Sequence, residues 1–268
     1  MMLRGASAEA LADLSEKLGS TRTLADSATL GEELFGVARV LRDEPALRRV
    51  LTDSAVEGEA KVGLVESVFG SALGARSVEV LKEAVQRRWT FSRDLADVLE
   101  HLGVLALVHS AGKDGGRVSD ELFAVRQLVD SSPELRTALS DPARSVQDRT
   151  GLLAGLLGNQ TLPATTTLVE QAVSGTGTTV DASLRAYQDI AAGARGETVA
   201  TVRTAQELSK DDEQRLAGAL GKQYDTTVHL HVVVEPDLVG GLRVEIGDDV
   251  IDGSVANRLD DARRRIAG

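Results

Sequence analysis

An internal repeat limits the possible folds of this chain more than any other feature of its sequence. Residues 33–85 align with residues 121–173 without a gap at an offset of 88, and 15 of the 53 pairs are identical. Chance at this composition would give roughly four identities. The identities include turn residues such as Pro45 and Pro133, which two unrelated amphipathic helices would not share. We therefore interpret the chain as containing a duplicated segment.

Both copies have the pattern of short amphipathic helices. Apolar residues in the first copy fall on one helical face, at Leu34, Val37, Val40 and Leu41. A proline then ends this run and starts a short second helix in each copy. The segment 110–117 has three glycines in eight residues and predicts a linker. Under the offset of 88, Leu64 and Leu152 are expected to be equivalent buried positions.

The sequence changes character after Gly196. Residues 197–204 are rich in β-branched side chains, and residues 228–235 and 242–246 alternate with the period of a strand. Between them, Ser209 precedes three acidic residues and predicts the N-cap of a helix.

We therefore predict a mainly α protein, with a duplicated N-terminal helical bundle followed by a small α/β C-terminal domain. The expected boundaries are residues 1–90 for the first helical copy, 91–195 for the second and 196–268 for the C-terminal domain.

Composition excludes several classes of protein. Apolar residues make up 42% of the chain and charged residues 26%, as in soluble globular proteins. The absence of cysteine excludes disulfide frameworks and thiolate sites. No apolar stretch is long enough for a membrane span, and no signal peptide is visible, so a cytoplasmic location is expected. The net charge of −11 argues against nucleic acid as a partner. The basic run 263–265 is better explained as favouring the end of a helix.

Glycines and acidic residues are concentrated between residues 237 and 259. Gly240 and Gly241 lie between two strand patterns, which favours a turn with positive φ over a phosphate-binding loop. The acidic residues at 247–249 lack the spacing of a calcium loop and predict a hairpin turn. Residues 252–254 then predict the start of a last helix.

Two further sets of residues are candidates for binding a metal ion or a partner protein. His229 and His231 lie two apart on one strand face, a spacing that zinc enzymes use, although solvent-facing or partner-facing histidines are the simpler interpretation. At the N-terminus the stripe formed by Leu11, Leu14 and Leu18 predicts either core packing or a partner-binding face. No catalytic motif is present, so we expect no catalytic, cofactor-binding or metal-binding residues and no cofactor.

The stretch "VVVEPDLVGGLRVEIGDDVIDGSVANRL" closely resembles the C-terminal signature of the delta subunit of F-type ATP synthase, the counterpart of the mitochondrial oligomycin-sensitivity-conferring protein. Its spacing is GG-x5-GD-x3-DGS, and Pro236, Asp237, Arg258 and Leu259 also match. The opening residues "AEAL" are similar to the start of the same family. Removal of 88 residues would leave 180, close to the usual length of a member.

The resemblance implies a non-catalytic stator subunit in proton-driven ATP synthesis, located at the cytoplasmic face of the cell membrane. Its helical domain would hold the alpha subunits of the catalytic head, and its C-terminal domain the b-type peripheral stalk. Contact with the membrane would be indirect, through the complex. Two alternatives stay open at this point: a helical-repeat adaptor with unrelated partners, and a metal hydrolase that uses His229 and His231.

Overall fold

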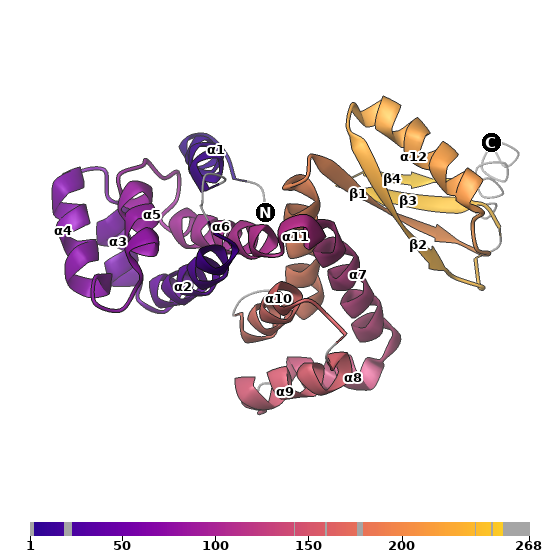
Figure 1. Ribbon diagram of the computed structural model, residues 1–268, viewed down its shortest axis with the longest axis horizontal. Helices are drawn as coiled ribbons and strands as arrows, with labels where there is room; N and C mark the ends of the chain where they lie inside the picture. Colours follow the sequence, from indigo (N-terminus) through magenta and orange to yellow (C-terminus); the bar gives the residue numbers. More distant parts are fainter. Residues whose placement is uncertain are drawn as a thin grey trace, which may run out of the picture. The chain divides into compact units, whose positions relative to one another are not determined.

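The fold is mainly helical with a small C-terminal sheet, as predicted. The computed structural model describes residues 3–18, 23–141, 143–158, 160–175, 179–238, 240–247 and 249–253. The chain divides into two compact units, unit 1 from Met1 to Ala191 and unit 2 from Ala192 to Gly268. Figure 1 labels the helices and strands of both units.

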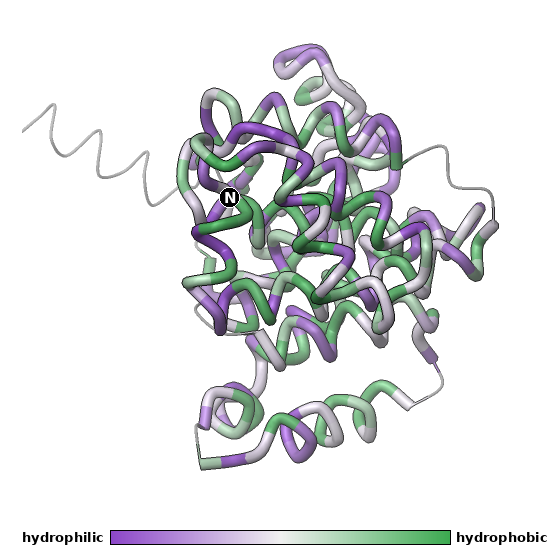
Figure 2. The backbone as a smooth tube through the Cα atoms, turned by 90° about the vertical axis from the view of Figure 1, so that its left-hand side faces the viewer, coloured by the Kyte–Doolittle hydropathy of each residue, from purple (hydrophilic) through white to green (hydrophobic). Residues whose placement is uncertain are grey.

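Unit 1 is built of helices. Hydrophilic and hydrophobic segments alternate along them (Figure 2), as expected for amphipathic helices that bury one face. The bounds are α1 (Ala6–Leu18), α2 (Leu24–Asp43), α3 (Pro45–Thr52), α4 (Gly58–Phe69), α5 (Ala75–Val85), α6 (Asp94–Ser110), α7 (Gly115–Ser131), α8 (Pro133–Ser140), α9 (Val146–Leu157), α10 (Pro163–Ser174) and α11 (Val180–Gly193).

The repeat is visible in the helix boundaries. Helices α3 and α4 begin and end 88 residues before α8 and α9. Equivalent side chains also cap neighbouring helices: Glu33 accepts a hydrogen bond from the backbone amide just before α5, and Glu121 accepts one from the amide just before α10. Likewise Arg48 donates to carbonyl oxygens at the end of α2, and Arg136 to one at the end of α7. The duplication therefore extends to the side chains that satisfy helix ends.

Helix α6 belongs to both copies. Leu95, Leu99 and Leu102 lie in the core that α1–α5 build, whereas Val104 and Leu107 lie in the core of α7–α11. Its apolar residues are buried on all sides, which is the pattern of a central helix. The boundary between copies at residues 90 and 91 stays a prediction, but the helix that follows it serves both cores.

Helices α2 and α6 approach each other closely (Figure 1). A Cβ atom on Gly31 would lie 2.7 Å from Cγ of Leu107 and 2.9 Å from the carbonyl oxygen of Gly103. A Cβ atom on Gly103 would lie 2.9 Å from the ring of Phe35. Only glycine at both positions permits this contact without a shift of the helices.

Three sequence-based expectations for unit 1 were wrong. Leu64 is only partly buried and Leu152 is 36% exposed, because α4 and α9 turn the next residues, Val65 and Leu153, into the core. Val40 is 39% exposed. Residues 110–117 are a tight connection rather than a linker, since a 3-10 turn at 112–114 leads directly into α7.

Unit 2 contains a four-stranded sheet in the order β2-β1-β3-β4. Strand β1 (Glu197–Thr204) is parallel to β2 (Thr227–Val234) and antiparallel to β3 (Leu242–Ile246), which forms a hairpin with β4 (Asp249–Asp252). Helix α12 (Lys210–Tyr224) connects β1 to β2, and Ser209 caps it as predicted. Its apolar side packs on Val202, Val228 and Val244. The last helix predicted after residue 253, and Asp248, lie outside the described residues.

Candidate partner-binding surfaces

Helix α1 presents an exposed surface at the N-terminal end of unit 1. The structure places Leu14 and Leu18 in the core, at 3% and 1% exposure, whereas Leu11 is half-buried at the edge. Of the predicted leucine stripe, only Leu11 therefore lies within reach of a partner while α1 stays in place. The fully exposed positions of α1 are mostly charged; they are Glu9, Ala12, Asp13, Glu16 and Lys17.

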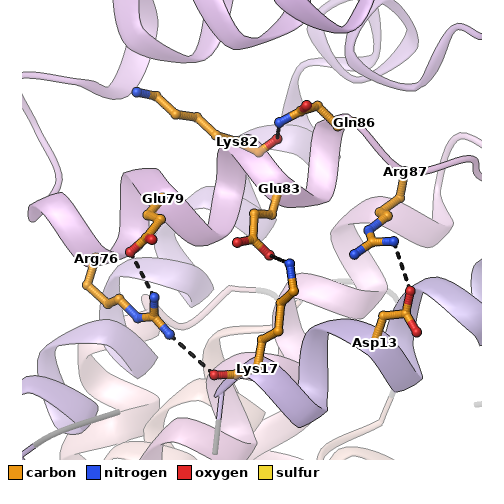
Figure 3. Close-up of polar contacts among 8 residues, drawn as sticks. All are labelled: Asp13, Lys17, Arg76, Glu79, Lys82, Glu83, Gln86 and Arg87. Carbon is orange, nitrogen blue, oxygen red and sulfur yellow. Dashed lines mark hydrogen bonds and ion pairs between the residues drawn. The ribbon is translucent and has the colours of Figure 1, made fainter. Parts of the chain in front are cut away.

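Ion pairs connect α1 to α5 (Figure 3). Lys17 Nζ lies 2.8 Å from Glu83, and Arg87, just after α5, lies 2.8 Å from Asp13. Arg76 also donates to the carbonyl oxygen of Lys17 over 3.3 Å. These side chains are partly exposed, so each pair contributes little to stability but helps to fix the position of α1 on α5.

A buried polar contact anchors the start of α1. The hydroxyl of Ser7 donates to Asp94 over 2.6 Å and accepts from the amide of Thr90 over 2.8 Å. Asp94 also accepts from the amide of Phe91 at the start of α6. The first turns of α1 and α6 are thus held by one carboxylate, which suits its position at two helix N-termini.

The equivalent surface of the second copy is covered. There α6 and α10 take the places of α1 and α5, and α2 of the first copy lies against both. Gln171, the counterpart of Glu83, accepts a hydrogen bond from Arg39 of α2 over 3.3 Å. Of the two equivalent surfaces, only that of α1 and α5 is free of a covering helix among the described residues of unit 1.

Unit 2 has an open groove between α12 and the sheet. It is lined by the apolar side chains of Leu208, Leu216 and Leu242, with Asp212 and Arg215 at its rim. Apolar residues with a few charges at the edge are typical of surfaces that accept an amphipathic helix. Sequence reasoning did not single out these residues, because they come together only through the packing of α12 on the sheet.

The glycine pair lies in a turn between two strands, as predicted, and this turn belongs to a crossover connection. Gly240 and Gly241 have φ of 75° and 81°, which favours glycine. The connection carries the chain from β2 past β1 to β3, and the amide of Glu235 donates to Thr204 at the end of β1. The pair leads into a strand rather than a helix N-terminus. The geometry therefore lacks the helix start that a phosphate loop uses.

The structure also places the other candidate residues of unit 2, the hairpin at Gly247 and the two histidines of β2. Gly247, with φ of 57°, follows Ile246, which pairs with Asp249, so β3 and β4 form a hairpin as predicted. The rings of His229 and His231 are 4.9 Å apart in an edge-on arrangement, on the sheet face opposite α12.

Among the described residues, no single helix is long and apolar enough to cross a membrane. In the part of the chain that the structure describes, one pair of helices, α6 and α7, has the length and composition of a membrane span when taken together, but the pair is bent by 114°. Since the apolar residues of α6 are buried in unit 1, its apolar character is explained by the two cores.

Comparisons with known proteins connect these surfaces to a family. The family model "ATP synthase delta (OSCP) subunit" matches residues 104–266, from the middle of α6 to the end of unit 2. The chain is 53% identical to the ATP synthase subunit delta of Nocardioides sp. (strain ATCC BAA-499 / JS614), over 99% of this chain and 98% of that protein.

A second relative is the ATP synthase subunit delta of Streptomyces coelicolor, which is 40% identical over 99% of this chain and 98% of its own length. The ATP synthase subunit delta of Nocardia farcinica is also 40% identical, over 98% of this chain and 99% of its own length. The first helical copy thus lies outside the family-model match but inside these full-length alignments. The chain belongs to the ATP synthase delta (OSCP) family, and it is a non-catalytic stator subunit that connects the catalytic head to the peripheral stalk.

Proposed function

We propose that unit 1 holds the alpha subunits of the catalytic head and that unit 2 holds the b-type stalk, in a complex at the cytoplasmic face of the cell membrane. The observation that carries this division is that each unit has its own hydrophobic core and its own exposed surface. A protein that connects two bodies needs two independent surfaces, and each unit supplies one.

The surface proposed for the alpha subunits is α1 together with α5 in the first copy. Its counterpart on α6 and α10 is covered by α2, which leaves one of the two equivalent surfaces for a partner. Glu9, Asp13 and Glu16 outnumber Lys17 among the exposed charges of α1. A partner segment with positive charge and an apolar residue for Leu11 would complement this surface. We keep Leu14 and Leu18 as supports of α1 rather than as contacts.

The surface proposed for the stalk is the groove of Leu208, Leu216 and Leu242 in unit 2. A stalk helix with an apolar face would bury these leucines when it lies in the groove. Asp212 and Arg215 at the rim would fix its direction through charge.

A crossover experiment with the full-length chain tests the assignment. Leu11→Arg should weaken binding to the purified catalytic head and leave stalk binding unchanged, whereas Leu208→Arg should do the reverse. Circular dichroism and melting temperature check that both variants fold. The reverse pattern, with Leu11→Arg affecting only the stalk, would show that the partners are exchanged between the units.

Fragments give an independent test. Residues 1–195 should bind the head, and residues 196–268 the stalk. Stripping the whole protein from membranes should abolish proton-coupled ATP synthesis while the released head still hydrolyses ATP.

A further inference from the structure

Glu100 connects three helices from both copies. It lies on α6 and accepts hydrogen bonds from the guanidinium of Arg42 on α2 and from the hydroxyl of Tyr187 on α11. Arg42 also donates to Asp97, one turn earlier on α6, over 3.0 Å. The side chains of Glu100 and Arg42 are 19% and 23% exposed, so solvent weakens these contacts less than it would at the surface.

Tyr187 binds the first copy through its ring as well as its hydroxyl. The ring is 3% exposed and stacks on Phe35 of α2, with centroids 6.3 Å apart. Burial, and then the neighbouring carboxylate of Glu100, raise the pKa of the Tyr187 phenol. The hydroxyl therefore keeps its proton and remains a hydrogen-bond donor at neutral pH.

The repeat shows that this link is additional to the duplicated plan. Gln188 is the counterpart of Glu100 at the offset of 88, and it accepts a hydrogen bond from Arg126 of α7 over 3.3 Å. That contact stays inside the second copy. The counterpart of Tyr187 is Leu99, which has no hydroxyl. Glu100 and Tyr187, which make the connection between the copies, are therefore both replaced by other residues at the equivalent positions of the repeat.

We propose that Glu100 and Tyr187 are positioning residues that lock the two helical copies into one rigid stator arm. A stator resists the torque of the rotor, so bending between the two helical copies would weaken it. The charge-assisted bonds to Glu100 tie α2 and α11 to the same point of α6, which opposes such bending. This inference rests on the stator function of the family, but not on which partner each unit holds.

Amide hydrogen exchange on the full-length protein tests the lock. In Tyr187→Phe the ring stack is kept and only the hydroxyl is lost; in Glu100→Gln the chain receives the residue of the second copy. Each variant should speed exchange in α2 and α11 by about tenfold, since loss of a hydrogen bond to a charged group opens the contact locally. The double variant should add little to Glu100→Gln, because both changes act on the same hydrogen bond between Tyr187 and Glu100. Tyr224→Phe is the matched control, because Tyr224 makes an exposed hydroxyl contact of 3.1 Å with Asp249 in unit 2.

The same variants in the assembled enzyme test the mechanical role. We expect binding of head and stalk, and ATP hydrolysis, to be unchanged, and ATP-driven proton pumping per ATP to fall. Unchanged exchange in α2 and α11, or fully additive effects, would overturn the lock. Faster exchange with normal pumping would overturn its mechanical role while the stator function stands. Loss of binding to either partner would overturn it too, since Tyr187 would then belong to a binding surface.

Discussion

The two helical copies share their scaffold and differ in their surfaces. Leu51 and Leu139 are equivalent core residues, with 0% and 1% of their surface exposed. Asp53 and Asp141 make the same turn, in which the carboxylate accepts a hydrogen bond from the amide two residues later. The exposed positions have little in common. A duplicated bundle thus keeps the residues that fold it and is free to change those that contact partners.

Helices α4 and α9 show the difference most clearly. On α4, Glu66 points outward and pairs with Lys82 of α5. Its counterpart on α9 is Ala154, and Leu152 and Leu156 beside it are 36% and 55% exposed. The first copy keeps a charged outer helix, whereas the second presents an apolar one.

The largest effect is expected at the shared core positions. Leu51→Ala and Leu139→Ala should each lower the free energy of unfolding by about 2–5 kcal/mol, since both remove a buried side chain from an equivalent site. Urea denaturation measures it, and Leu152→Ala, at an exposed site, should cost less than about 1.5 kcal/mol. A near-neutral result at one of the pair would mean that only one copy keeps the repeat's core.

A pH effect should come from His101, which is the counterpart of the exposed Lys17 when residues 95–103 are aligned with residues 11–19. Burial lowers the pKa of His101 from 6.5 to about 4. Above pH 6.5 the side chain is neutral in both states. As pH falls toward 4, the unfolded chain binds a proton that the folded chain does not, so stability is lost, by about 2 kcal/mol at pH 5. Denaturation at pH 7 and pH 5 should show this loss and its reduction in His101→Gln. The same loss in both proteins would assign it to other groups.

The capping glutamates should differ in strength. Glu121 is 12% exposed and binds the amide of Leu162, the hydroxyl of Thr165 and Arg117, whereas Glu33 binds, among the described residues, the amide of Gly74 alone. We expect Glu121→Ala to destabilise by about 1.5–3 kcal/mol and Glu33→Ala by about 0.5–1.5 kcal/mol. Denaturant midpoints of the two variants compare them directly. Equal values would show that burial does not strengthen this cap in the second copy.

The smallest effect is expected at the surface of α1. A double-mutant cycle on Asp13 and Arg87 should give a coupling of about 0.2–1 kcal/mol that disappears in high salt. The matching contact in the second copy, Arg39 to the buried and neutral Gln171, should be much less sensitive to salt. A salt-independent coupling at Asp13 and Arg87 would indicate that the first surface is as enclosed as the second.

The sequence was sufficient for features set by local chemistry. The Ser209 cap, the positive φ of Gly240 and Gly241 and the alternating strands follow from residue type and spacing. The buried face of α9 could not be predicted in this way. Leu152 and Leu153 are adjacent and equally apolar, so only the packing decides which of them turns into the core. The groove of unit 2 likewise depends on how α12 lies on the sheet.

The double role of α6 had a signal in the sequence. Residues 102–108 are apolar without interruption over two turns, so every side of this part of the helix is apolar, and such a segment is buried on every side. The repeat alone suggested two bundles with separate sets of helices. Hydropathy around the helix axis, rather than its position in the alignment, indicates that one helix completes both.

The sharing of α6 also affects how the protein can be made and enlarged. During synthesis α1–α5 leave the ribosome first, but their core is finished only when α6 follows, and α6 then offers a preformed wall for α7–α11. Each copy therefore begins on the last helix of the one before. An arm of this kind lengthens by five helices and 88 residues at a time, with no new end to cap, as a solenoid grows.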